Sequence, residues 1–167
     1  TLLRYVGVDI DPRCARSRNE SAGVFVEIGS VFDNAFLKEV RRRHGPFDVI
    51  IDDGGHTAAH AVSDLRFAER VVTNGGVVFV DDIFNPEWPG VIEGVAAYLH
   101  TTPSLSPFAF VGNKLLMTTI SMKPEILRRY SAHMGRSPGC KKAGMCFGDK
   151  PWFGHAVHTR KRGRGEV

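Results

Sequence analysis

The chain has 167 residues, 43% of them apolar, which is a single-domain length with enough apolar side chains for one sizeable core. Three cysteines and the absence of an apolar run of membrane-spanning length argue against a disulfide-rich secreted domain and an integral membrane protein, and they favour a cytoplasmic location. The net charge of +4 is uneven, because residues 136–167 carry eight Lys or Arg against two acidic residues, whereas the rest is close to neutral.

In chain order, continuous apolar runs alternate with amphipathic stretches. Strands are predicted over residues 2–9, 23–29, 47–52, 77–82, 108–112 and 114–120, the last two as a hairpin. Helices are predicted over residues 12–21, 33–45, 57–72, 89–99 and 124–134, and residues 74–76 are predicted to turn the chain into the fourth strand. This alternation is typical of an α/β fold, with a doubly wound, mostly parallel sheet and a carboxyl-terminal antiparallel hairpin.

Residues 1–135 are predicted to form this domain, and residues 136–167, rich in Gly, Pro and basic side chains, an irregular extension. The run HTRKRGRG in the extension has the character of a phosphate-contacting arm, although charge runs of this size are usually solvated termini. A nucleic-acid partner is therefore an alternative that the sequence does not favour. A membrane partner is not expected, and an oligomer is compatible with the sequence.

Carboxylates end three of the predicted strands, at Asp9, at Asp52-Asp53 and at Asp81-Asp82. Ligands of parallel α/β sheets bind in the crevice where the carboxyl ends of the strands meet. Asp9 is placed to accept hydrogen bonds from both hydroxyl groups of a ribose, or to cap the following helix, and the sequence leaves both interpretations open.

The two acidic pairs favour a hard-cation site. Adjacent carboxylates repel each other unless a cation or a hydrogen-bond donor lies between them. Two such pairs on neighbouring strand ends supply the oxygen ligands that Mg²⁺ prefers, whereas a cysteine-rich zinc site would look different. The alternative is that these aspartates cap the following helices, but one cap explains only one member of each pair.

His56 follows the first acidic pair across two glycines, within reach of the same site. An imidazole titrates near neutral pH, so it is suited to take a proton from a hydroxyl group whose pKa a bound metal has lowered. The alternative interpretation is a capping or surface histidine. Trp88, in NPEWPG, is expected to anchor a loop at the edge of the site.

The chain resembles the class I S-adenosylmethionine-dependent methyltransferases, most closely the macrocin and mycinamicin sugar O-methyltransferases and the cephalosporin-hydroxylase-like group. The resemblance spans residues 5–99 and rests on YVGVDIDP, EIGSVFDNAFL, FDVIIDDGGH, NGGVVFVDDIF and NPEWPGVIEGVAAYL. It implies a Rossmann-like fold and a metal-assisted transfer of a methyl group to a hydroxyl of a small molecule, such as a sugar or polyol.

The resemblance also implies cofactor contacts. Asp9 would bind the ribose of S-adenosylmethionine, Ser30 and Val31 would lie along the adenine, and Asp52 would lie near the methionine end. Many members carry a glutamine at the position of Val31, so one adenine hydrogen bond is expected to be absent here.

For the reaction, the resemblance implies that Asp53, Asp81 and Asp82 hold Mg²⁺ or another divalent cation and that His56 is the base. The glycine-rich loop that cradles the cofactor in this family should precede Thr1, so the first strand, that loop and a helix are expected to be missing. A catalytically inactive remnant or a binding module with the same fold is therefore a second interpretation, and an RNA methyltransferase that uses the basic extension is a third.

Overall fold

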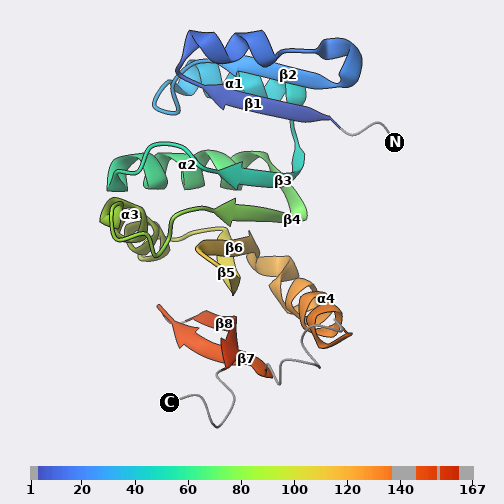
Figure 1. Cartoon of the computed structure of the whole chain (residues 1–167), viewed down its shortest axis with the longest axis vertical. Coiled ribbons are helices and arrows are strands. Elements are labelled where there is room, and N and C mark those ends of the chain that lie inside the picture. Colours follow the sequence, from blue (N-terminus) through green and yellow to red (C-terminus); the bar gives the residue numbers. More distant parts are fainter. Residues whose placement is uncertain (1–3, 137–145, 154, 162–167) are drawn as a thin grey trace.

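The computed structural model describes residues 4–136, 146–153 and 155–161 (Figure 1). The strands are β1 (Tyr5–Asp9), β2 (Val24–Ile28), β3 (Phe47–Asp52), β4 (Val72–Val80), β5 (Leu105–Val111), β6 (Lys114–Thr119), β7 (Cys146–Trp152) and β8 (His155–Lys161). The α-helices are α1 (Asn34–His44), α2 (Ala58–Val71), α3 (Pro89–Leu99) and α4 (Lys123–Arg136). Short 3₁₀ helices cover Pro12–Ser17, Glu20–Ala22 and Ile120–Met122. The expected α/β class is confirmed.

The strands form two sheets rather than one. β1 pairs in parallel with β2, and six further strands lie in the order β3-β4-β6-β5-β8-β7. Within the larger sheet β3 is parallel to β4, and the predicted hairpin is confirmed, because β6 runs antiparallel to both β4 and β5. Figure 1 shows β1, β3 and β4 with their arrowheads on the same side of the molecule. The chain passes from the smaller sheet to the larger one through α1, which lies between β2 and β3 in the sequence. No described strand pairs with both sheets.

The main core lies between the larger sheet and helices α2 and α3. Leu65 of α2, Val95 of α3 and Val78 of β4 are completely buried in it. The two helices approach closely at Gly94, where a Cβ atom would lie 2.5 Å from the carbonyl oxygen of Ala58. This packing fixes both helices against the sheet whose strand ends carry the acidic residues.

Helix starts follow ordinary capping chemistry. The Asp33 carboxylate accepts hydrogen bonds from the backbone N–H groups of Ala35 and Phe36 and so begins α1. The Thr57 hydroxyl accepts one from the N–H of His60 and begins α2. Thr57 follows His56 directly, so the cap of α2 fixes the backbone beside the predicted base.

Two local predictions are wrong. The single helix predicted over residues 12–21 is replaced by two 3₁₀ helices, because Asn19 forms a bridge with Val24 and interrupts the helical hydrogen bonds. The predicted turn at residues 74–76 lies inside β4, where Gly75 has φ +84° and the pairing with β3 shifts register. A glycine in this conformation forms an irregularity in the strand rather than a reversal of the chain.

The prediction that the extension is irregular is wrong in part, because β7 and β8 form an antiparallel hairpin and β8 pairs with β5. Trp152 contacts the Phe110 ring at a centroid distance of 5.1 Å, and Val157 is fully buried. Residues 137–145, 154 and 162–167, including the end of the basic run, lie outside the described residues.

The first and third strands are less buried than their apolar sequences predict. Tyr5 of β1 is 62% exposed, and Val49 and Ile51 of β3 are 57% and 66% exposed. The side chains of Val49 and Ile51 leave the same face of β3, since they are two residues apart.

No helix within the described residues is long and apolar enough to cross a bilayer.

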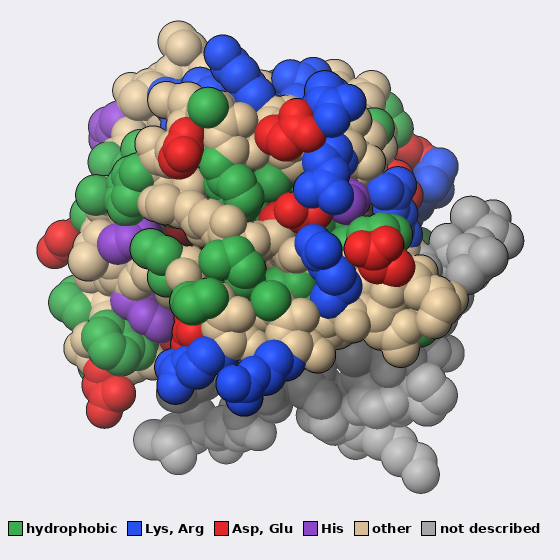
Figure 2. Space-filling view, turned by 90° about the horizontal axis from the view of Figure 1, so that it is seen from above, with side chains coloured by type: hydrophobic (Ala, Val, Ile, Leu, Met, Phe, Trp, Pro, Cys, Tyr) green, Lys and Arg blue, Asp and Glu red, His purple; other side chains and the backbone are tan. Residues whose placement is uncertain are grey.

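Figure 2 shows the face above β1, β2 and α1, where Lys and Arg side chains alternate with acidic ones. The ion pairs Arg13–Asp11, Arg42–Glu39 and Arg43–Glu27 lie in these elements and their loops. The charge on this face is therefore mixed in sign, unlike the single-sign surface that typically follows a nucleic-acid backbone.

Candidate metal and cofactor site

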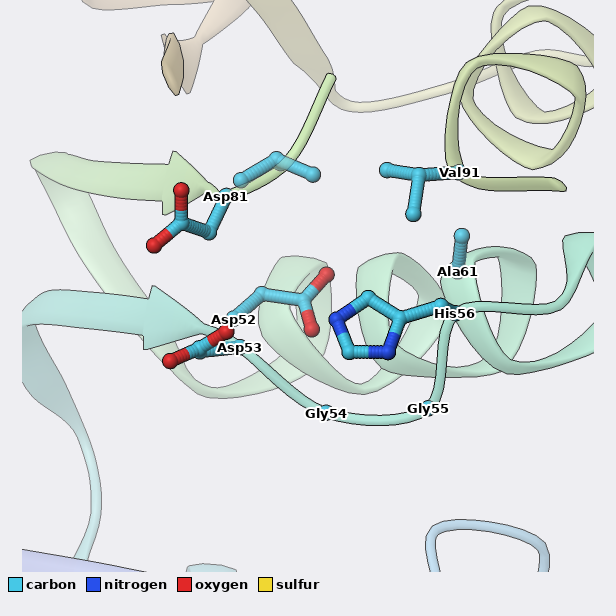
Figure 3. A pocket seen from close by; sticks show the side chains of 9 residues that line it. Asp52, Asp53, Gly54, Gly55, His56, Ala61, Asp81 and Val91 are labelled. Carbon is cyan, nitrogen blue, oxygen red and sulfur yellow. The ribbon is translucent and has the colours of Figure 1, made fainter. Parts of the chain in front are cut away.

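The carboxyl ends of β3 and β4 bring the two acidic pairs together. The backbone N–H of Asp81 donates to the carbonyl of Asp52 at 2.9 Å, so the two strand ends are joined by a hydrogen bond. Figure 3 shows that the side chains of Asp52 and Asp53 leave the end of β3 in opposite directions. The residues around them line a shallow hollow that is open to solvent, with Val91 of α3 and Ala61 of α2 on its apolar side.

Asp53, His56 and Asp82 form a cluster of ligand atoms. One carboxylate oxygen from each aspartate and a ring nitrogen of His56 all lie within 4.8 Å of one another. His56 Nε2 is 3.2 Å from Asp82 Oδ2, but it has no aligned hydrogen-bond partner among the described residues. The chain reaches this geometry across Gly55, where a Cβ atom would lie 2.4 Å from the His60 ring.

Asp82 is held in place by two asparagines. Asn113 and Asn85 both donate from Nδ2 to Asp82 Oδ1, at 2.7 and 3.1 Å. Asp82 has φ +55°, a left-handed conformation that aspartate tolerates better than most residues but that still has an energetic cost. These bonds leave Oδ2 directed toward His56.

Asp81 is paired with Lys114 of β6 through a short ion pair on its Oδ2 atom. The Lys114 ammonium lowers the pKa of the Asp81 carboxyl, which is therefore ionised near neutral pH. The other oxygen of Asp81 accepts a hydrogen bond from the backbone N–H of Asp82 at 2.8 Å. Of the three carboxylates Asp53, Asp81 and Asp82, only Asp81 has an ammonium partner among the described residues.

Asp52 has a different environment from Asp53. Its carboxyl is turned toward α2, where Asp64 lies close by, and both groups border Gly54. Burial, together with the negative charge of Asp64, raises the pKa of Asp52 to about 8, and burial raises the pKa of Asp64 to about 6. Asp64 Oδ2 is buried and has no donor among the described residues, so a proton shared with Asp52 would satisfy it.

The other predicted cofactor residues lie on β1 and after β2. Asp9, exposed at the end of β1, accepts hydrogen bonds from the backbone N–H of Asp11 at 2.8 Å and from the thiol of Cys14 at 3.3 Å. Ser30 Oγ accepts from the N–H of Phe32, and the carbonyl of Val31 accepts from Ser63 of α2. Asp9 thus stabilises its own loop and also keeps an exposed carboxylate.

Four residues of this site were missed by reading the sequence. They are Asp64, Asn85, Asn113 and Lys114. Asn113 and Lys114 sit where the predicted hairpin turns, and β6 pairs with β4 so that Leu115 lies opposite Val80. That register places Lys114 beside Asp81, and only the strand order in space reveals it.

The α/β fold, with acidic residues at or just after the carboxyl ends of β1, β3 and β4, is that of a Rossmann-like domain, a class in which ligands commonly bind at these strand ends. Residues 2–83 match the family described as "Methyltransferase domain". The predicted resemblance to methyltransferases is thus confirmed over residues 2–83, about half of the chain.

Among curated proteins, the chain is similar to the 8-demethyl-8-(2-methoxy-alpha-L-rhamnosyl)-tetracenomycin-C 3'-O-methyltransferase of Streptomyces olivaceus. The two are 36% identical over 87 residues, and the matched region covers 52% of this chain and 22% of that protein. It is 40% identical over 85 residues to the L-olivosyl-oleandolide 3-O-methyltransferase of Streptomyces antibioticus, covering 50% of this chain and 21% of that protein. The matched region thus spans about a fifth of the length of these relatives.

Among solved structures, the fold is similar to that of the MycE methyltransferase from mycinamycin biosynthesis, solved in complex with Mg, SAH and mycinamycin VI. The TM-score is 0.57 at 21% sequence identity, over 77% of this chain and 42% of that one. At this level of identity the similarity establishes the Rossmann-like fold.

Proposed function

We propose that this chain carries the metal-binding and proton-accepting part of an S-adenosylmethionine-dependent O-methyltransferase that acts on a hydroxyl of a sugar or polyol-like small molecule. The observation that carries the proposal is the cluster of Asp53, His56 and Asp82 at the carboxyl edge of the sheet. The names of the similar proteins, which are O-methyltransferases of glycosylated natural products, support the class of acceptor.

The donor set fits a divalent cation such as Mg²⁺. Asp53 and Asp82 would hold it, and Asp81, which leaves the adjacent strand end, would complete the set of oxygen ligands. Asp53 and Asp82 have no Lys or Arg partner among the described residues, so their oxygens are available to a cation. When bound, the cation would act as a Lewis acid and lower the pKa of the acceptor hydroxyl.

His56 is placed to take the proton of the acceptor hydroxyl. His56 Nε2 lies 3.2 Å from Asp82 Oδ2 and has no aligned hydrogen-bond partner among the described residues, so its lone pair is available to accept a proton. The acceptor oxygen, once it loses its proton to this atom, has the nucleophilicity needed to form a bond to a methyl carbon. Part of the catalytic effect would then come from the fixed position of the imidazole.

For the cofactor, Asp9 offers its exposed carboxylate to the ribose, and Ser30 and Val31 border the adenine position. The Asp52 carboxyl is turned toward α2 and is largely protonated near neutral pH. It would therefore act as a hydrogen-bond donor to the cofactor rather than as an anion. S-adenosylmethionine, when bound, supplies the electrophilic methyl group.

Isothermal titration of the chain with Mg²⁺, and then with S-adenosylmethionine, tests the proposal. We expect Asp53→Asn to weaken Mg²⁺ binding, whereas Glu39→Gln, on the exposed surface of α1, should bind like the wild type. His56→Ala should lower turnover but leave cofactor affinity nearly unchanged. Failure of both Mg²⁺ and cofactor to bind, in this chain and in one extended upstream, would contradict the enzymatic function. Binding without turnover would instead support the inactive or binding-module interpretation.

A further inference from the structure

We propose that Trp88 is a positioning residue that fixes the orientation of the His56 imidazole, an inference that rests on the proposed function of His56. The two rings are stacked, with a centroid distance of 4.6 Å and an interplanar angle of 20°. Trp88 remains 42% exposed, so it is not buried for the sake of the core. A large aromatic residue at a half-exposed position is accounted for by this contact.

Within the described residues, hydrogen bonds do not orient the half-buried side chain of His56. No hydrogen bond from a described residue holds its ring, and the nearest charged group, Asp82 Oδ2, lies 3.2 Å from Nε2 without hydrogen-bond alignment. An imidazole that no hydrogen bond orients can occupy more than one rotamer. The flat face of the indole removes that freedom, because a ring stacked on it can slide but cannot tilt without losing contact.

The backbone around Trp88 is itself fixed to the backbone of His56. The Trp88 N–H donates to the carbonyl of Asn85 at 3.0 Å, and Pro89 begins α3 directly afterwards. At Gly90 a Cβ atom would lie 2.6 Å from the carbonyl oxygen of His56, so α3 starts in contact with the segment that carries the imidazole.

Asn85 also donates to Asp82, so one short loop between β4 and α3 holds both the neighbour of Nε2 and the ring that stacks on His56. The loop therefore sets the orientation of the imidazole relative to the carboxylates. This gives Trp88 a role in the site beyond anchoring a loop.

NMR on the chain tests the stack without any turnover. The signal of the His56 ring protons, assigned with His56→Gln, should be shifted upfield by the ring current of the indole. We expect the shift to disappear in Trp88→Leu and to persist, at reduced size, in Trp88→Phe. Trp152→Phe, which changes the other tryptophan of the chain, should leave it unchanged. An unshifted signal in the wild type, or one that Trp88→Leu does not move, would overturn the proposal.

Turnover tests the consequence of the stack. Trp88→Leu should lower kcat by roughly 10- to 100-fold, as expected when a reacting group loses its fixed position, while the Kd for Mg²⁺ stays close to the wild-type value. Trp88→Phe should restore most of kcat, because a flat ring is retained. A kcat in the Leu variant equal to that of the wild type would also overturn the proposal. If the wild type binds no Mg²⁺, the proposed function is contradicted, and the NMR experiment alone tests the stack.

Discussion

Asn113, at the turn between β5 and β6, donates a 2.7 Å hydrogen bond to Asp82, at the end of β4, although 31 residues separate them in the sequence. The bond helps to hold Asp82 in a left-handed backbone conformation and directs its second oxygen toward His56. The geometry of the candidate metal site thus depends on an antiparallel hairpin that contributes no carboxylate of its own.

The first prediction concerns this hydrogen bond. Asn113→Ala should weaken divalent-cation binding by roughly 10-fold, the effect usually seen when a group that orients a ligand is removed. Titration with Mn²⁺ measures the change. Asn74→Ala, which removes hydrogen bonds to Thr119 and Ser121 away from the site, is the matched control and should bind the ion like the wild type. Equal affinities in the two variants would show that Asn113 does not orient a ligand.

The second prediction concerns the ammonium group of Lys114, which pairs with Asp81. Lys114→Gln should raise the pKa of Asp81 and leave three carboxylates without a neighbouring ammonium. We expect the metal-free variant to unfold at a lower temperature and to gain more from added Mg²⁺ than the wild type does, because the ion then relieves a larger repulsion. Thermal melts with and without Mg²⁺ measure both effects. An identical Mg²⁺-induced shift in the two proteins would contradict this account.

The third prediction concerns the dependence of stability on pH. The folded pKa values of Asp52 and Asp64, about 8 and about 6, both lie above the ordinary value for an aspartate, so the protonated pair stabilises the fold fully at low pH. This contribution is lost as pH rises from about 4, the ordinary pKa of an aspartate, and the loss is complete above about pH 8. Asp64→Asn should flatten the decline and raise the free energy of unfolding near pH 8 by on the order of 2 kcal/mol.

Urea unfolding in metal-free buffer, at about pH 5 and about pH 8, measures this difference. Glu39→Gln changes an exposed carboxylate on α1 and should keep the wild-type slope. A steeper decline of stability with pH in Asp64→Asn would reverse the sign of the prediction and rule out a shared proton.

The fourth prediction concerns the packing of α2 on α3. Gly94→Ala places a methyl group 2.5 Å from the carbonyl oxygen of Ala58, so the helices must move apart at a cost of about 1–3 kcal/mol. Gly7→Ala is the control, because its nearest neighbour is a Tyr5 side-chain atom at 3.4 Å. Chemical denaturation compares the two variants, and equal stabilities would show that α2 and α3 can move apart without loss.

The sequence alone predicted most elements and the candidate residues, because both depend on local patterns. The strand FDVIID and helices α1, α2 and α3 follow from runs and periods of apolar residues that act within one element. The motifs that carry the family resemblance are likewise continuous stretches. The roles assigned to Asp9, Ser30, Val31, Asp52, Asp53, Asp81, Asp82 and His56 remain predictions.

The tertiary structure decided which groups balance the charges of the site and where the sheet is divided. Lys114 meets Asp81 and Asn113 meets Asp82 only because β6 pairs with β4, and Asp64 meets Asp52 only because α2 packs behind β3. Likewise, apolar runs could not reveal that β1 and β3 belong to separate sheets with exposed side chains. Local sequence sets the conformation and chemistry of each segment, whereas contacts between distant segments follow from strand order and helix packing, which no single segment encodes.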